Sequence, residues 1–92
     1  MAWKIEFTKK ADKSLQNMDW VIRKRIVHFL RDRIATSTNP RSLGESLSGN
    51  TLGNYWKYRV GDYRLICSIQ DEKITVQVIK IGNRRDVYNN FS

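Results

Sequence analysis

Segment 55–68 alternates apolar and polar residues on both sides of Gly61-Asp62, and this pattern predicts a β-hairpin. Gly-Asp is a suitable dipeptide for a two-residue hairpin loop. Such a loop fixes the cross-strand partners. They are Val60 with Tyr63, Arg59 with Arg64, Tyr58 with Leu65, and Lys57 with Ile66.

The two faces of this hairpin differ in character, because successive side chains of a strand point to opposite sides. The apolar face can pack on a core and carries Trp56, Tyr58, Val60, Tyr63, Leu65 and Cys67. The opposite face is largely polar and carries Tyr55, Lys57, Arg59, Arg64 and Ser68. Like charges that face each other across a ladder are destabilising. The opposed arginines therefore indicate that this face has an anionic partner.

Residues 73–81 alternate in the same way and predict a third antiparallel strand, reached by a turn at Asp71-Glu72. A two-residue turn would give the pairs Ile69 with Ile74, Cys67 with Val76, Leu65 with Val78, Ser68 with Thr75, Ile66 with Gln77, and Arg64 with Ile79. In this register Arg64 lies in the central strand of a three-stranded meander.

The first half of the chain predicts one short strand and two helices. Residues 2–7 alternate as a strand, and Thr8 is a suitable N-cap for a helix over 9–17. Asp19 is the expected N-cap of a longer helix that ends near residue 35. Its core-facing stripe is predicted to be Ile22, Ile26, Phe29, Leu30, Arg33 and Ile34. Residues 41–53, with three glycines, are predicted to be a loop.

These elements predict a single α+β domain over residues 1–92. We expect a small antiparallel sheet, made of the meander and the N-terminal strand, with the two N-terminal helices packed on one face. The apolar stripes of the helices and the apolar face of the meander would together form the core.

The charge of the chain limits the kinds of partner that it can bind. The chain has a formal net charge of +8 and a pI of about 10.0, which favours polyanionic partners such as nucleic acid or an acidic protein. The longest apolar runs are too short to span a bilayer, and no secretory signal is recognisable. We therefore expect a cytoplasmic protein without a membrane partner. Cys67, the single cysteine, is predicted to be a packing residue.

The residue types exclude several kinds of active site. One histidine, one cysteine and scattered carboxylates make a metal site improbable by composition, and no glycine-rich phosphate loop or Ser-His-Asp set is present. We therefore predict no metal and no cofactor. The remaining group of cations, with two tyrosines, can bind a phosphodiester. RNA carries its own nucleophile, the 2′-hydroxyl, so such a group could assist its cleavage.

The chain resembles the RelE toxins of the RelE/ParE superfamily over nearly its whole length. The resemblance rests on the order of elements and on four motifs: Leu47-Ser48-Gly49, the strand with Lys57 and Arg59, Asp62-Tyr63-Arg64-Leu65, and Gly82-Asn83-Arg84-Arg85-Asp86-Val87-Tyr88. It implies a RelE-like fold and a ribosome-dependent endoribonuclease that cuts mRNA in the A site of the 70S ribosome. It also implies a cognate acidic antitoxin, similar to RelB, that holds the toxin inactive.

The resemblance also implies roles for individual residues. Lys57 would be a base or an electrostatic stabiliser, Arg64 the ligand of the transition-state phosphate, and Arg84 a phosphate ligand and possible acid. Tyr88 would be a base or a stacking and orienting group, so the residue that accepts the proton stays open. We expect four further residues to bind RNA: Tyr55, Arg59, Lys80 and Arg85.

Two other functions are compatible with the same residues. One is a ParE-like toxin that acts on DNA gyrase and has no nuclease activity. The other is a non-catalytic RNA- or DNA-binding module, in which single substitutions would weaken binding uniformly.

Overall fold

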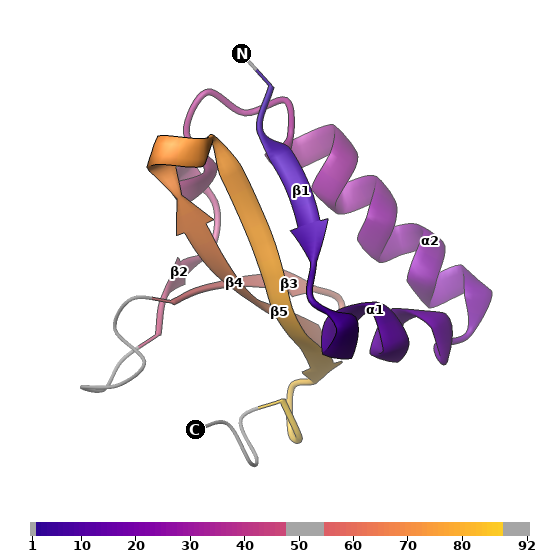
Figure 1. Cartoon of the computed structure of the whole chain (residues 1–92). Coiled ribbons are helices and arrows are strands. Elements are labelled where there is room, and N and C mark those ends of the chain that lie inside the picture. The colour runs from indigo at the N-terminus through magenta and orange to yellow at the C-terminus, as the bar shows by residue number, and fades with distance from the viewer. Residues whose placement is uncertain (1, 48–54, 88–92) are drawn as a thin grey trace.

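A computed structural model of the chain describes residues 2–47 and 55–87 (Figure 1). Two α-helices and five strands follow one another in the chain. In order they are β1 (Lys4–Phe7), α1 (Lys9–Gln16), α2 (Trp20–Phe29), β2 (Glu45–Ser46), β3 (Trp56–Val60), β4 (Tyr63–Gln70) and β5 (Thr75–Asn83). The expected Tyr88 falls outside the described residues.

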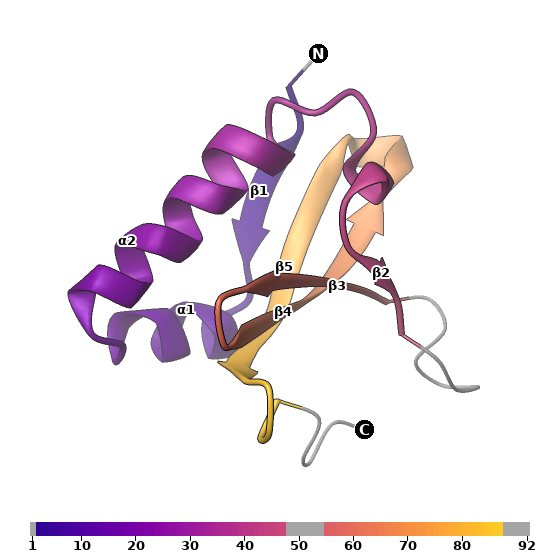
Figure 2. The ribbon, with the colours of Figure 1, turned by 180° about the vertical axis from the view of Figure 1, so that it is seen from behind.

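The five strands form one sheet in the order β1-β5-β4-β3-β2. The contacts among β2, β3, β4 and β5 are antiparallel, whereas β1 pairs with β5 in parallel. The sheet is therefore mixed, and the prediction of a wholly antiparallel sheet was wrong for the N-terminal strand. Both helices lie together on one side of it (Figures 1 and 2). The predicted α+β class, with two helices on one face of a meander, is confirmed. The loop predicted over 41–53 was wrong at Glu45–Ser46, which forms an edge strand, and its positions 48–53 lie outside the described residues.

The starts of both helices agree with the sequence. The Thr8 hydroxyl accepts a hydrogen bond from the Ala11 amide at 3.1 Å, which caps α1. The same hydroxyl donates to the Ile79 carbonyl at 3.0 Å and so ties the helix to β5. Asp19 occupies the N-cap position of α2, but its side chain makes no capping hydrogen bond.

The end of the second helix differs from the expectation. A π-helical turn over Leu30–Ile34 follows α2, and the Ala35 amide donates to the Leu30 carbonyl at 2.8 Å. Hydrogen bonds from i+5 to i widen the turn and shift which side chains face the core. Ile34 is buried, whereas Arg33 is exposed. The inclusion of Arg33 in the apolar stripe was therefore wrong.

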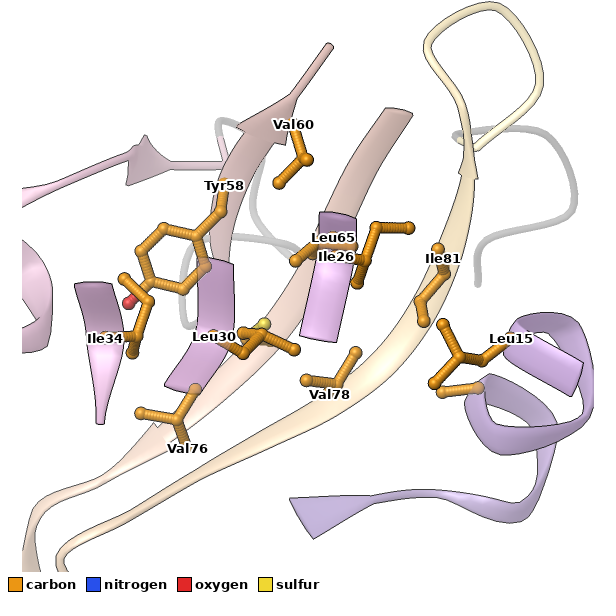
Figure 3. Close-up of a cluster of buried hydrophobic side chains, with 12 residues drawn as sticks. Leu15, Ile26, Leu30, Ile34, Tyr58, Val60, Leu65, Val76, Val78 and Ile81 are labelled. Atoms are coloured by element: carbon orange, nitrogen blue, oxygen red, sulfur yellow. The ribbon is translucent and has the colours of Figure 1, made fainter. Parts of the chain in front are cut away.

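The core lies between the helices and the apolar face of the sheet (Figure 3). Tyr58 is fully buried, packs edge-on against Phe29 with ring centroids 5.7 Å apart, and donates its hydroxyl to the Pro40 carbonyl at 2.6 Å. Cys67 is also fully buried in this cluster, as predicted. The core members are Ala11, Leu15, Ile26, Leu30, Ile34, Tyr58, Val60, Leu65, Cys67, Val76, Val78 and Ile81.

The β3–β4 hairpin has the predicted register, including Arg59 opposite Arg64 and Lys57 opposite Ile66. Gly61 adopts φ +60, a value that glycine accepts at no steric cost and that a tight hairpin turn requires.

The predicted β4–β5 register was wrong. The connection takes four residues, because Asp71–Lys73 forms a 3-10 turn and Ile74 follows it with φ +48. Ile69 consequently pairs with Val76, and Cys67 with Val78. This shift of two residues preserves the faces of the strand.

A β-bulge at Ile79 then changes the faces. Cys67 pairs with Val78 but Ile66 pairs with Lys80, so Ile79 has no partner of its own in β4. Beyond the bulge Arg64 lies opposite Gly82, and not opposite Ile79 as the sequence suggested.

Across residues 2–47 and 55–87, neither helix combines the length and the apolar character that a membrane span requires.

Candidate functional site

The polar face of the sheet, on the side away from the helices, carries two rows of residues that run across the strands. Strand pairing sets Glu45, Lys57, Ile66 and Lys80 side by side from β2 to β5. The adjacent row contains Arg59, Arg64 and Gly82. The sequence predicted the basic members of both rows, and the structure brings them together on one face.

A hollow of about 270 Å³ opens on this face. Its lining comes from β3, β4 and the start of β2, and consists of Gly44, Glu45, Lys57, Arg59 and Arg64. We call it the cationic hollow. Of the five described residues that line it, three are cations that the sequence selected. An anionic group of the size of a phosphodiester is the complementary ligand for such a cluster.

Glu45 is the charged member of the cationic hollow that the sequence did not predict. One of its carboxylate oxygens lies 3.3 Å from Lys57 Nζ. The Glu45 side chain is 71% exposed and that of Lys57 is 27% exposed, so the pair is accessible from solvent. A two-residue edge strand has no alternation that could reveal it, which is why the residue was assigned to a loop.

The Arg64 side chain is held against the hairpin turn. Its guanidinium Nη1 donates to the carbonyls of Gly61 and Tyr63, at 3.2 and 3.1 Å. Arg59 lies opposite Arg64 on β3. Among the described residues, no carboxylate forms an ion pair with either arginine. The two opposed cations therefore retain donors that an anion could accept.

Lys80 reaches the polar face because of the bulge. If Ile79 were part of a regular strand without a bulge, β5 would alternate evenly and Lys80, two residues after Val78, would share the core side with it. The pKa of Lys80 is lowered, chiefly because burial disfavours the ammonium form and additionally because Lys10 is a nearby positive charge. A phosphate beside Lys80 would offset both effects.

The segment after β5 folds into a turn at the hairpin end of the sheet. The Arg84 amide donates to the Asp62 carbonyl at 2.8 Å, and the Asn83 carbonyl accepts from the Val87 amide at 2.8 Å. The side chains of Arg84 and Arg85 are exposed, and neither lines the cationic hollow. They lie beside it, since Asp62 belongs to the turn that Arg64 contacts.

A small apolar cluster interrupts the polar face. Ile66 is fully buried there beneath Leu47 and Val87, and the half-buried Tyr55 packs against them. Tyr55, which the sequence assigned to RNA binding, thus also has a packing role.

Within residues 2–47 and 55–87, no group of three or more His, Cys, Asp or Glu side chains is arranged so that it could hold a metal ion.

Comparison with known proteins decides the family. The family model described as the ParE toxin of type II toxin-antitoxin systems, parDE, matches residues 5–88. The chain belongs to this family. It is therefore a toxin of the RelE/ParE superfamily, which confirms the resemblance found in the sequence.

Individual relatives of this ParE-family toxin carry RelE-type names. It is 30% identical over 88 residues to Toxin RelG of Mycobacterium tuberculosis, which covers 96% of this chain and 98% of that protein. The toxin-antitoxin complex RelBE2 of the same species matches with TM-score 0.81 and 27% identity, over 94% of this chain and 95% of the other. The RelE-RelB complex of Pyrococcus horikoshii matches with TM-score 0.72 and 25% identity, over 95% and 100%.

The isolated RelE toxin of Escherichia coli shares the fold, with TM-score 0.69 over 89% of this chain and 84% of the other, at 23% identity. The RelE-like fold expected from the sequence is thereby confirmed.

Proposed function

We propose that this toxin is a metal-independent, ribosome-dependent endoribonuclease that cleaves mRNA in the A site and so inhibits translation. The observation that carries the proposal is the cationic hollow, in which Lys57, Arg59 and Arg64 line one exposed site. The RelE-type relatives support it, because the chain matches them over nearly its whole length.

The chemistry requires few protein groups. The 2′-hydroxyl of RNA attacks the adjacent phosphorus in line, which gives a 2′,3′-cyclic phosphate and a 5′-hydroxyl. The protein has to orient the backbone, assist proton transfer and stabilise the negative charge of the transition state. Arg64 suits the last task, because two backbone carbonyls hold its guanidinium before any substrate binds.

The other residues take supporting roles in the proposal. Lys57 would stabilise charge in the hollow, and Arg84 would bind a flanking phosphate and could act as an acid. Tyr88 would orient the substrate or accept its proton. The residues proposed to bind the RNA backbone are Tyr55, Arg59, Lys80 and Arg85.

An acidic antitoxin is the proposed regulatory partner. The relatives RelBE2 and RelE-RelB were crystallised as toxin-antitoxin complexes. A partner of this +8 chain should carry net negative charge, because complementary charge steers association and suppresses wrong partners. We place this pair and its ribosomal target in the cytoplasm.

The test is a cleavage assay on programmed 70S ribosomes with mRNA in the A site, with mapping of the new 5′ ends. We expect cuts at fixed positions within the A-site codon. Arg64→Ala should lower the rate by about 10²–10³-fold, because it removes one transition-state charge donor. Arg33→Ala is the matched control, since it removes an exposed arginine from the helical side of the molecule. Equal rates for the two variants would contradict the role of Arg64.

The matching family carries the ParE name. The alternative to a nuclease is therefore a ParE-like toxin that acts on DNA gyrase. Intact mRNA at full ribosome occupancy, together with gyrase-dependent DNA breaks, would establish that alternative. Cleaved mRNA without such breaks would exclude it. A uniform loss of RNA binding in the variants, with no cleavage by the wild type, would instead indicate a binding module.

A further inference from the structure

The outward side of α2 carries a second group of cations, remote from the cationic hollow. Its members come from α2 and the π-helical turn that follows, and their spacing of three and four residues places them on one helix face. They line a hollow of about 360 Å³ and are Trp20, Arg23, Lys24, Val27, His28 and Arg31. We call this face the basic helix surface. Both helices lie on the side of the sheet away from the cationic hollow (Figures 1 and 2), so the two surfaces point in different directions.

Trp20 distinguishes this surface from an ordinary solvated helix face. It is the most exposed large apolar side chain among the described residues, with 61% of its surface accessible. A single exposed apolar residue is common in proteins. Here, however, Lys24 Nζ lies 5.8 Å from the centroid of the Trp20 ring, which is a cation–π contact. An exposed flat ring beside cations is a typical platform for a nucleobase.

The cations of the basic helix surface have few acidic neighbours. None of the described residues that line it is acidic. Arg23 and Lys24 form no ion pair with a carboxylate of the described residues. Arg31 lies 3.4 Å from Asp32, but both side chains are more than half exposed, so this contact is weak. The surface therefore keeps a positive charge that attracts polyanions.

The composition of this surface fits RNA better than a protein partner. Charged residues are depleted from the centre of protein interfaces, whereas three of the six described lining residues are cations. Interfaces with nucleic acid are much more positively charged than those between proteins. Surfaces that bind RNA combine cations, which contact phosphates, with aromatic rings, on which unpaired bases stack. Trp20 and the three cations supply both elements.

We propose that the basic helix surface docks the toxin on ribosomal RNA, with an unpaired base stacked on Trp20 and backbone phosphates against the cations. This inference rests on the proposed function, which places the toxin on the ribosome. Ribosomal RNA is the favoured source of the ligand, because the mRNA would occupy the cationic hollow on the other side of the molecule. The toxin then holds two RNA strands at once, one as an anchor and one for cleavage.

The first measurement is sedimentation with 70S ribosomes that carry no mRNA. Trp20→Leu keeps an apolar side chain but removes the ring, so it should raise the dissociation constant about 5–100-fold, the range for one lost stacked base. Trp20→Phe should restore most of the affinity. Val21→Ala is the matched control, since Val21 is an exposed apolar neighbour that does not line the surface, and its affinity should stay within twofold. Equal affinities for Trp20→Leu and the wild type would overturn the inference.

The second measurement is the salt dependence of the same binding. Arg23→Ala should lower the slope of log affinity against log salt concentration by about one unit, because one phosphate contact is lost. Arg33→Ala removes the same charge from an exposed position outside the surface, so the slope should not change. Equal changes of slope in both variants would show that only net charge matters, which contradicts a defined docking site.

The third measurement separates docking from catalysis. At saturating toxin, Trp20→Leu should cleave mRNA on programmed ribosomes at a rate within threefold of the wild type, because the surface does not touch the scissile phosphate. Below saturation the variant should be slower, in proportion to its weaker binding. A lower saturating rate with unchanged ribosome binding would exclude a docking role for Trp20.

Other partners give different results. If Trp20→Leu binds vacant ribosomes normally but binds an mRNA oligonucleotide more weakly, the surface belongs to mRNA. If only the binding of an acidic antitoxin is weakened, the surface belongs to a protein. Either result, or a wild type that does not bind vacant ribosomes, overturns the inference.

Failure of the docking site can be distinguished from failure of the proposed function. If the wild type binds vacant ribosomes, Trp20→Leu binds them weakly and mRNA stays intact, the nuclease function fails and the docking site stands. If the wild type cleaves mRNA and Trp20→Leu binds ribosomes equally tightly, only the docking site fails.

Discussion

Single residues determine how closely β2 approaches β3. Gly44 has a left-handed backbone, and a Cβ there would overlap the Lys57 carbonyl oxygen and lie 2.8 Å from both Trp56 Nε1 and Tyr58 Cδ1. Gly61 is also left-handed, but a Cβ there would meet only the end of the Arg25 side chain, at 3.0 Å. The two glycines share a backbone requirement and differ in the space around them.

This difference gives a matched pair of stability predictions. Gly61→Ala should lower the free energy of unfolding by about 1–2 kcal/mol, the cost of the left-handed conformation. Gly44→Ala should cost about 1–3 kcal/mol more, because rigid backbone and ring atoms would have to move. Denaturant unfolding of both variants measures the difference. Equal losses would show that the space around Gly44 is unimportant.

At the same scale, the sequence predicted the cations and missed the carboxylate. Arg59 and Arg64 could be placed because they lie in long alternating strands, where every side chain has a defined face. Glu45 could not, because its position depends on a two-residue contact with β3 that no local pattern encodes. Neighbouring Gly44 was the available signal, as glycine marks close approaches of the backbone.

At the scale of elements, turns decided which registers were predictable. The β3–β4 register followed from a two-residue loop, which fixes all pairs once it is identified. The β4–β5 connection uses Ile74 in a left-handed conformation, which a β-branched residue rarely adopts. Such a turn gives no sequence signal, and neither does the bulge at Ile79.

That same turn is joined to the loop before β2. The Arg41 guanidinium donates to both carboxylate oxygens of Asp71, at 2.9 Å each, and so links segments that are 30 positions apart in the chain. This ion pair fixes the segment that begins at Pro40. The Pro40 carbonyl in turn accepts a hydrogen bond from the buried Tyr58 hydroxyl.

The Arg41–Asp71 pair should make stability depend on acid pH. Hydrogen bonds from Arg41 hold the pKa of Asp71 below its ordinary value of 3.8. Because the folded-state pKa is the lower one, the contribution is complete above 3.8 and is lost as the pH falls through the folded-state pKa. We expect the wild type to be more stable than Asp71→Asn at pH 6, with the difference shrinking below pH 4. A difference that grows on acidification would contradict this assignment.

At the scale of the whole molecule, the core and the cationic hollow lie on opposite faces of the sheet. The helices and the apolar face of the sheet enclose the core, which leaves the other face free for the cationic hollow. The class, the layers and the face of the site were predictable because they depend on periodicity alone. The apolar cluster around Ile66 was not, because Leu47 and Val87 come from segments without periodic pattern.

The single cysteine offers a probe of global stability. Cys67 is fully buried in the central strand, and burial raises the pKa of its thiol. We expect labelling by a thiol reagent to be about a thousandfold or more slower in native buffer than in denaturant, because the thiol reacts only in opened molecules. Denatured protein should bind one equivalent of reagent. Rapid labelling of the native protein would show that β4 is exposed more easily than its place in the core indicates.

The extra residue in β5 has a consequence for comparing relatives. In β5 the even-numbered side chains face the core before Ile79, whereas the odd-numbered ones face it afterwards. The strand therefore supplies Val76 and Val78 to the core in its first half and Lys80 to the site in its second. Deleting Ile79 alone would restore regular alternation and would keep Lys80 on the polar face and Ile81 on the core face, because Lys80 would then directly follow Val78. A relative that lacks one residue at this position would therefore have a regular strand in place of the bulge and the same side chains on each face.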